Sequence, residues 1–196
     1  MIPIILASAS ERRKELLFQL IGDNFQVCVS SYVEKQDPQL KVTGLVTQHS
    51  EGKAKDISTN FKEGIIISAD TVIECQGKIL GKPASREEAK EMLQTISGRK
   101  ITAVTGLTVM DITSRKIITE TELTDVWIRD MPESFIDTYL STGEPMGKAG
   151  ALAIQGRGAV IVEKIEGDFF NVVGLPLYLL SRMLEEFGIE VLKVFK

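Results

Sequence analysis

The most constraining feature of this sequence is an apolar run over residues 64–74 that a single carboxylate interrupts. Three consecutive isoleucines precede Ser-Ala-Asp-Thr, and a valine and an isoleucine follow it. A β-branched run that is apolar at successive positions predicts a strand at the centre of a sheet. The carboxylate within it, Asp70, must then be paired, bind a metal or emerge into a cleft, unless it only caps the next turn.

The first twenty residues predict a strand, a turn of small residues and a helix. Residues 2–6 are a short apolar run, and Ala-Ser-Ala-Ser follows at 7–10. Apolar residues then recur at helical spacing, with Ser10 as the expected N-cap and Gly22 as the expected stop.

Two arginines, Arg12 and Arg13, fall in the first turn of this helix. The helix dipole is positive there, so each exposed cation costs about 0.3–1 kcal/mol. A bound anion would reverse that cost, because backbone N–H groups and guanidinium groups together form a phosphate-binding cradle. The alternative is a solvated helix start in which the arginines pair with Glu11 and Glu15. The stretch alone favours neither interpretation.

Hydrophobic periodicity predicts alternating helices and strands in the rest of the chain. Further helices are expected over residues 43–57, 85–96, 132–143 and 174–187. Further strands are expected over residues 25–29, 100–111, 117–129, 159–165 and 189–195, with the second and third forming an antiparallel hairpin.

The loops carry several of the polar residues. Residues 30–41 form a polar loop that holds Glu34, and Lys82 lies in an extended Gly-Lys-Pro segment. Residues 144–158 are glycine-rich yet contain an apolar run before Gln155, which is typical of a loop that shapes a pocket. His49, within an expected helix, is interpreted as a surface or helix-packing residue.

Length and composition limit the class of protein. A chain of 196 residues can bury a sizeable core, as one domain or as two closely joined lobes. A net charge of −4 argues against a general nucleic-acid or membrane surface, so a polyanion site must be a local basic pocket. Cys28 and Cys75 lie far apart, without a metal-binding spacing. No signal peptide or membrane span is apparent, and we expect a cytoplasmic protein.

Four groups of motifs follow one another along the chain. They are Leu-Ala-Ser-Ala-Ser-Glu-Arg-Arg at 6–13; Ser-Ala-Asp-Thr-Val at 68–72 with Gly-Lys-Pro at 81–83; Gly-Glu-Pro-Met-Gly-Lys-Ala-Gly at 143–150 with Ile-Gln-Gly at 154–156; and Asn-Val-Val-Gly-Leu-Pro at 171–176. Each motif alone is weak, but the ordered set resembles the Maf family, the septum-formation-inhibitor-like nucleoside triphosphate pyrophosphatases.

The resemblance implies one Maf-like domain over residues 1–196. Its fold would be α/β, an elongated twisted mixed β-sheet with flanking helices and two lobes around a cleft, similar to inosine triphosphatase. It also implies hydrolysis of a nucleoside triphosphate to the monophosphate and pyrophosphate with a divalent cation, Mg²⁺ or Mn²⁺, commonly by a homodimer. The expected partner is therefore the nucleotide substrate, with no nucleic acid and no membrane.

The resemblance assigns roles by position. Asp70 matches the general base, and Arg12, Thr71 and Gln155 match positions linked to substrate choice. The remaining polar residues of the expected cleft are Ser8, Arg13, Glu34, Lys53 and Lys82.

The chemistry of these residue types agrees with the assignment. Attack of water on an α-phosphorus requires cations that spread the charge of the triphosphate. Glu34 and Asp70 offer hard oxygen ligands to a metal, and a carboxylate beside that metal can deprotonate the attacking water. Asp70 cannot use one oxygen for both tasks, and the sequence leaves that choice open.

The motifs differ in what they imply about the nucleobase of the substrate. The pyrimidine-preferring branch of the family commonly has His where this chain has Ile101, and Asp where it has Gly147. The Ile-Gln-Gly motif around Gln155 still favours dTTP and UTP over modified nucleotides such as 7-methyl-GTP. An amide also suits the edge of a base better than a phosphate.

A protein of another class, a cell-division-regulating interaction protein, is the alternative that the sequence leaves open. An acidic net charge without an aromatic-interleaved basic stripe argues against nucleic-acid binding. The sequence has no Walker A motif or kinase-type glycine-rich loop, which disfavours other phosphoryl-transfer enzymes.

Overall fold

A computed structural model of the chain describes residues 2–35, 37 and 39–194. The chain divides into two compact units. Unit 1 comprises Met1–Asp70, Thr105–Glu122 and Gly174–Lys196, and unit 2 comprises Thr71–Val104 and Leu123–Val173.

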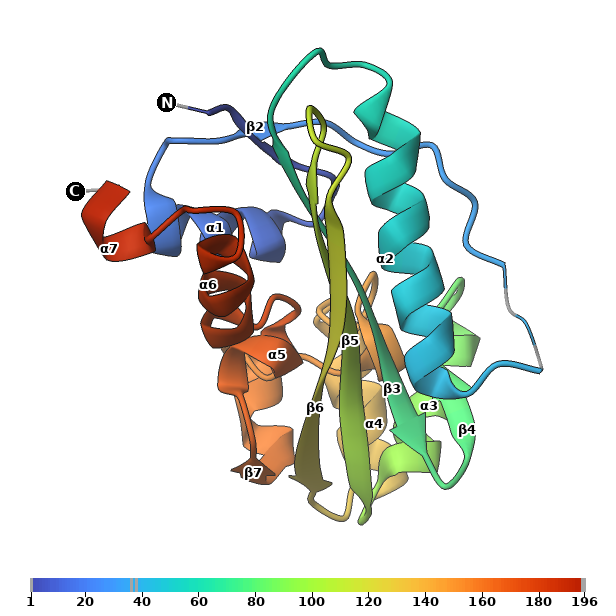
Figure 1. Cartoon of the computed structure of the whole chain (residues 1–196). Helices are drawn as coiled ribbons and strands as arrows, with labels where there is room; N and C mark the ends of the chain where they lie inside the picture. Colours follow the sequence, from blue (N-terminus) through green and yellow to red (C-terminus); the bar gives the residue numbers. More distant parts are fainter. Residues whose placement is uncertain (1, 36, 38, 195–196) are drawn as a thin grey trace. The chain divides into compact units, whose positions relative to one another are not determined.

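The expected α/β class, a mixed sheet with flanking helices, is confirmed (Figure 1). The sheet has seven strands in the order β2-β1-β3-β5-β6-β7, and β4 pairs with β3. β1 runs parallel to β2 and β3, whereas β4 and β7 are antiparallel to their partners. The strands are β1 (Ile4–Leu6), β2 (Gln26–Val27), β3 (Ile65–Cys75), β4 (Lys78–Leu80), β5 (Lys100–Asp111), β6 (Ile117–Ile128) and β7 (Val162–Glu166).

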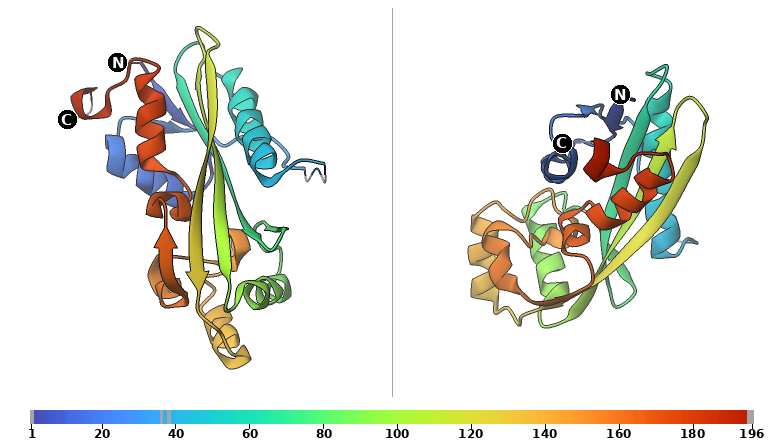
Figure 2. Two further views of the ribbon diagram at one scale, coloured as in Figure 1. Left: turned by 60° about the horizontal axis from the view of Figure 1, so that its bottom comes forward. Right: turned by 60° about the vertical axis from the view of Figure 1, so that its left-hand side comes forward.

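In unit 1, the chain passes from β1 into α1 (Glu11–Ile21), and the helix begins and ends where the sequence predicts. The side chain of Ser10 caps the first turn, and Gly22 ends the helix with a positive φ of 61°. α1 packs against α6 (Leu177–Glu185), as Figure 2 shows. The longest helix, α2 (Val42–Ser58), contributes Ala54 and Ile57 to a core that includes Ile66 of β3.

In unit 2, helices α3 (Arg86–Ile96) and α4 (Glu133–Ser141) pack together. Their buried apolar faces share a core with the unit 2 part of the sheet. The expected cap of α3 is present, since Ser85 Oγ accepts a hydrogen bond from the backbone N–H of Glu88 at 3.2 Å. Two 3₁₀ helices (Ala149–Ala151 and Gly156–Ile161) shape the glycine-rich segment, and a short helix, α5 (Phe169–Val173), follows β7.

The predicted strand over residues 159–165 begins too early. The chain forms a 3₁₀ helix up to Ile161, and β7 starts at Val162. The carboxylate of Glu144 explains the difference, because it accepts hydrogen bonds from the backbone N–H groups of Arg157 at 3.0 Å and Gly158 at 3.2 Å. These bonds hold the start of the segment in a turn.

The predicted closing strand over residues 189–195 is wrong within the described residues. α7 (Val191–Val194) occupies its place, and Phe195 lies outside the described residues. The carbonyl oxygen of Glu190 accepts hydrogen bonds from the N–H groups of Lys193 and Val194, which closes a helical turn. The predicted strand over residues 25–29 is also shorter than expected, since only Gln26 and Val27 pair with β1 and both are exposed.

Candidate active site

Asp70 lies in β3 and is buried, with 6% of its surface exposed. Two side chains from α2 bind its carboxylate. Lys53 Nζ lies 2.7 Å from Oδ1, and His49 Nδ1 lies 3.0 Å from Oδ2. His49 and Lys53 are four residues apart, so they project from the same face of the helix. Pairing, one of the alternatives that the sequence leaves open for a carboxylate in this strand, is therefore observed.

His49 is buried and contacts Asp70, so its interpretation as a surface residue is wrong, whereas the alternative of a helix-packing residue is not contradicted. Its second ring nitrogen, Nε2, lies 2.9 Å from the carbonyl oxygen of Lys35. A carboxylate and a carbonyl can only accept hydrogen bonds, so the ring satisfies both partners when both of its nitrogens carry a proton and the imidazole is cationic. The hydrogen bond to Asp70 raises the pKa of His49 against the opposing effect of burial.

The charge of Asp70 follows from the same contacts. Burial alone raises the pKa of a carboxyl group. Here the hydrogen bond from His49 and the charge of Lys53 outweigh burial, and the pKa of Asp70 lies well below its ordinary value. Asp70 is therefore ionised at neutral pH.

Glu34 lies in the loop before α2, and Lys53 joins it to the cluster. Its Oε1 is 2.6 Å from Lys53 Nζ, and its side chain is 48% exposed. The loop is held on α2 at a second point, because Asp56 accepts hydrogen bonds from Ser30 Oγ and from the backbone N–H of Ser31, each at 2.7 Å. The position of Glu34 therefore depends on α2.

The turn between β1 and α1 places the N-terminal motif in unit 1. Ser8 Oγ accepts a hydrogen bond from the backbone N–H of Ser10 at 3.1 Å, which orders the turn. Arg13 is buried, and its Nε donates to the carbonyl oxygen of Gly174 at 2.7 Å. The first and last of the sequence motifs therefore meet at this arginine. Its neighbour Arg12 is half-buried at the start of the same helix.

Arg13 and Asp70 influence each other electrostatically. Burial lowers the pKa of Arg13, and the charge of Asp70 opposes this shift. The charge of Arg13 in turn contributes to the low pKa of Asp70. An arginine remains protonated in proteins, so Arg13, Lys53 and His49 form a cationic surrounding for Asp70.

Three of the predicted site residues belong to unit 2. Thr71, which follows Asp70 in β3, is half-buried, whereas Lys82 and Gln155 are exposed. The segment around Gln155 is held by Glu144, whose carboxylate binds the two backbone N–H groups that follow Gly156. The roles of these three residues stay predictions.

A divalent cation fits part of the cluster in unit 1. Ligand atoms of Glu34, His49 and Asp70 lie within 4.8 Å of one another. Carboxylate oxygens suit Mg²⁺ and Mn²⁺, and Glu34 is accessible for coordination. Both ring nitrogens of His49 are engaged, Nδ1 by Asp70 and Nε2 by the carbonyl oxygen of Lys35, which in this arrangement leaves neither for a metal. Glu34 and Asp70 are the two members of this group that the sequence predicts as metal ligands, and that role stays a prediction.

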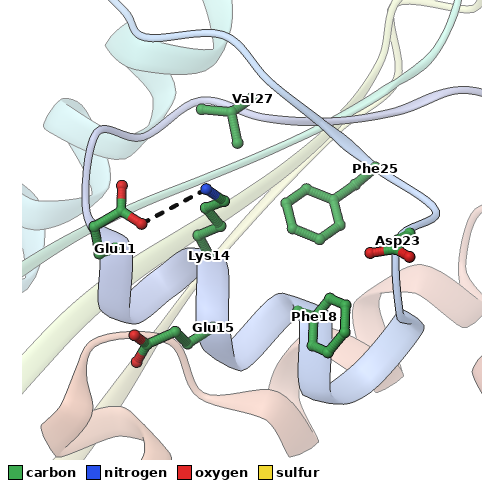
Figure 3. Close-up of a pocket in the computed structure, with 7 residues that line it drawn as sticks. All are labelled: Glu11, Lys14, Glu15, Phe18, Asp23, Phe25 and Val27. Carbon is green, nitrogen blue, oxygen red and sulfur yellow. Dashed lines mark ion pairs between the residues drawn. The ribbon is translucent and has the colours of Figure 1, made fainter.

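A pocket of unit 1 lies elsewhere, between the outer face of α1 and the segment that leads into β2 (Figure 3). Its charged side chains are mainly acidic, and Lys14 forms an ion pair with Glu11 at 3.6 Å. This balance is unfavourable for a triphosphate. The lining residues are Glu11, Lys14, Glu15, Phe18, Asp23, Phe25 and Val27.

Within the part of the chain that the structure describes, no helix is both long enough and apolar enough to span a membrane.

Solved structures define the class of fold. The chain is similar to a HAM1 protein from Coxiella burnetii, with a TM-score of 0.53 at 15% identity over 95% of this chain and 100% of that one. It is also similar to the Staphylococcus aureus Ham1 protein, with a TM-score of 0.52 at 13% identity over 94% and 99% of the two chains. At these identities the likeness concerns the α/β fold alone.

The sequence comparisons are more specific. A family model described as Maf-like protein matches residues 3–187, so the chain belongs to the Maf-like family and the resemblance is confirmed. Among its relatives is a dTTP/UTP pyrophosphatase from Methanosarcina mazei, 56% identical over 96% of this chain and 95% of that protein. Another protein of this name, from Caldicellulosiruptor saccharolyticus, is 43% identical over 97% of each chain.

The seating of the Glu34 loop on α2 can be tested at Gly52. A Cβ atom at this position would overlap the ring of Tyr32, whereas one at Gly44 would meet Leu40 at an ordinary 3.6 Å. Glycine-to-alanine changes in a helix stabilise it by about 0.5–1 kcal/mol where space permits. We expect this gain for Gly44→Ala, and for Gly52→Ala a loss of about 1–3 kcal/mol from overpacking. Chemical denaturation of both variants checks this, and an equal gain would show that Tyr32 does not rest on Gly52.

Proposed function

We propose that this protein is a nucleoside triphosphate pyrophosphatase that hydrolyses dTTP and UTP to the monophosphate and pyrophosphate. The observation that carries the proposal is a buried, ionised Asp70 surrounded by cationic side chains in a chain of the Maf-like family. The choice of dTTP and UTP as substrates follows the names of its relatives, which are 56% and 43% identical over nearly the full length. Such an enzyme would remove unwanted nucleotides from the cellular pool.

In this proposal, the N-terminal turn and the cations bind the triphosphate. Ser8 lies in the turn before α1, and Arg12 and Arg13 lie in its first turn, where the backbone N–H groups and the helix dipole favour an anion. Lys53 and Lys82 add positive charge, which stabilises the charge that develops on the phosphate oxygens during attack. Burial of Arg13 strengthens its interaction with a phosphate, because fewer water molecules screen it.

A divalent cation, Mg²⁺ or Mn²⁺, would be held directly by Glu34 and through a water molecule by Asp70, and would supply further positive charge toward the triphosphate. Asp70 is the proposed acceptor of the proton from the attacking water. Both of its oxygens are already hydrogen-bonded, so one must be released first. A phosphate that attracts the ammonium of Lys53 would release Oδ1, while His49 keeps its bond to Oδ2.

The remaining features of the proposal rest on the family and on composition. We propose that residues 1–196 act as one Maf-like domain, in a cytoplasmic homodimer that uses a small nucleotide and no nucleic acid. The net charge of −4 supports the last point, because a nucleic-acid surface is generally basic.

The proposed activity is tested with a panel of nucleoside triphosphates that includes dTTP, UTP, purine nucleotides and 7-methyl-GTP, with Mg²⁺, Mn²⁺ or EDTA. We expect monophosphate and pyrophosphate as products, a preference for dTTP and UTP, and loss of activity in EDTA. Asp70→Asn should retain the fold and lose about 10²–10⁴-fold in kcat, as for a general base. Release of inorganic phosphate, or near-normal turnover by the folded variant, would contradict the proposed reaction.

We further propose that Gln155 selects the base. In this proposal, the side-chain amide pairs with the edge of a pyrimidine. Its removal leaves polar groups of the nucleobase unpaired, at a cost of about 1–3 kcal/mol. Gln155→Ala should therefore lower kcat/KM for dTTP and UTP more than for purine triphosphates. Val160→Ala, at a 61% exposed residue of the same segment, is the matched control and should change neither. An equal loss across all bases would mean that Gln155 only shapes its loop.

A further inference from the structure

Among the hydrogen bonds of the described residues, those of His49 connect Asp70 to the backbone of the loop that carries Glu34. Within this described part of the chain, no other side chain of α2 makes both contacts. Its ring donates from Nδ1 to Asp70 Oδ2 at 3.0 Å and from Nε2 to the carbonyl oxygen of Lys35 at 2.9 Å. We propose that His49 is a positioning residue, which holds the carboxylate of Asp70 and the loop that carries Glu34 in the arrangement needed for hydrolysis. This inference rests on the proposed function for its catalytic consequence.

The loop follows α2 through a series of contacts spaced about one helical turn apart. Asp56 binds the backbone of Ser31, and the ring of Tyr32 lies against Gly52. Lys53 then binds Glu34, as described above. The last of these contacts is the one between His49 and Lys35, with the rings of His49 and Tyr32 6.1 Å apart. Glu34 is therefore fixed on both sides, by Tyr32 before it and by Lys35 after it.

The two hydrogen bonds of His49 have distinct consequences. Lys53 carries its charge at the end of a long side chain and also contacts Glu34, and the proposed reaction draws it toward phosphate. The bond from His49 Nδ1 is then the contact that keeps the carboxylate of Asp70 oriented. The bond from Nε2 affects Glu34, and hence the binding of metal and substrate. Loss of the first should lower kcat, and loss of the second should raise KM.

Three substitutions separate these bonds. In His49→Asn, the side-chain amide occupies the place of Nδ1 and can bind Asp70 without reaching Lys35. In His49→Gln, the amide lies near the place of Nε2 and can bind Lys35 without the bond to Asp70. His49→Leu fills the space and makes neither bond. The first two variants each retain one of the two hydrogen bonds, whereas the third retains neither. The three side chains are of similar size, so the comparison isolates the hydrogen bonds.

Steady-state hydrolysis of dTTP by the full chain with Mg²⁺ gives the first measurement. We expect kcat to fall about tenfold or more in His49→Leu and His49→Gln and to stay within about threefold of the native value in His49→Asn, because a lost orienting contact to a general base removes part of its 10²–10⁴-fold effect. We expect KM to rise in His49→Leu and His49→Asn and to be restored in His49→Gln. Equal losses in all three variants, or none, would overturn the proposal.

Limited trypsin digestion gives a second measurement that needs no activity. The carbonyl that His49 binds belongs to the peptide bond that trypsin cleaves after Lys35. Cleavage there, followed by mass spectrometry, should accelerate several-fold in His49→Leu and His49→Asn and not in His49→Gln. Cleavage after Arg115, in the exposed turn between β5 and β6, is the internal control and should be unchanged.

The two measurements distinguish the failure of the inference from that of the proposed function. If the native protein does not hydrolyse dTTP, the proposed function fails, and the trypsin pattern alone decides whether His49 holds the loop. If hydrolysis occurs but cleavage after Lys35 is the same in all variants, the positioning role is wrong and the proposed function stands.

Discussion

The structure of unit 1 depends on one interaction, the pairing of the Asp70 carboxylate with two cations of α2. A carboxylate in the middle of a buried strand is costly unless it is paired and hydrogen-bonded. His49 and Lys53 provide this pairing from adjacent turns of one helix, at 3.0 Å and 2.7 Å. The same two side chains hold the loop of Glu34 through Lys35 and through Glu34 itself. A strand, a helix and a loop are thereby fixed around a single charge.

This pairing sets a pH range for the stability of unit 1. The pKa of His49 is raised in the folded state, so its contribution is complete below about 6.5 and is lost as the pH rises through the raised value. The pKa of Asp70 is depressed, so its contribution is present above about 3.9 and is lost as the pH falls through the native value. Both contributions are therefore complete between about pH 3.9 and pH 6.5, where the cluster stabilises the fold most.

Much of the fold was predictable because the relevant signals are local. The caps at Ser10 and Ser85 and the stop at Gly22 act on their own helices, and each was found where the sequence placed it. The need of Asp70 for a partner was likewise predictable, since it follows from burial alone. The resemblance to the Maf family then supplied the site residues that the sequence could not connect by itself.

The errors arise where contacts distant in sequence decide the conformation. The late start of β7 depends on Glu144, which binds the backbone thirteen and fourteen residues further on. His49 was missed because its partner in β3 is 21 residues away. A signal was present nevertheless, since His49 lies four residues before Lys53 and both were predicted on one helix. A histidine four residues before a predicted site lysine lies on the same face of the helix as that lysine.

The ring titration of this histidine tests the central claim most directly. The chain has one histidine, so its ring proton signals in an NMR spectrum are unambiguous. The account predicts a midpoint above the ordinary value of about 6.5 in the metal-free protein, and a lower midpoint in folded Asp70→Asn, because the hydrogen bond to Asp70 is the largest cause of the shift. A midpoint at or below 6.5 that Asp70→Asn leaves unchanged would contradict the pairing on which the rest of the account is built.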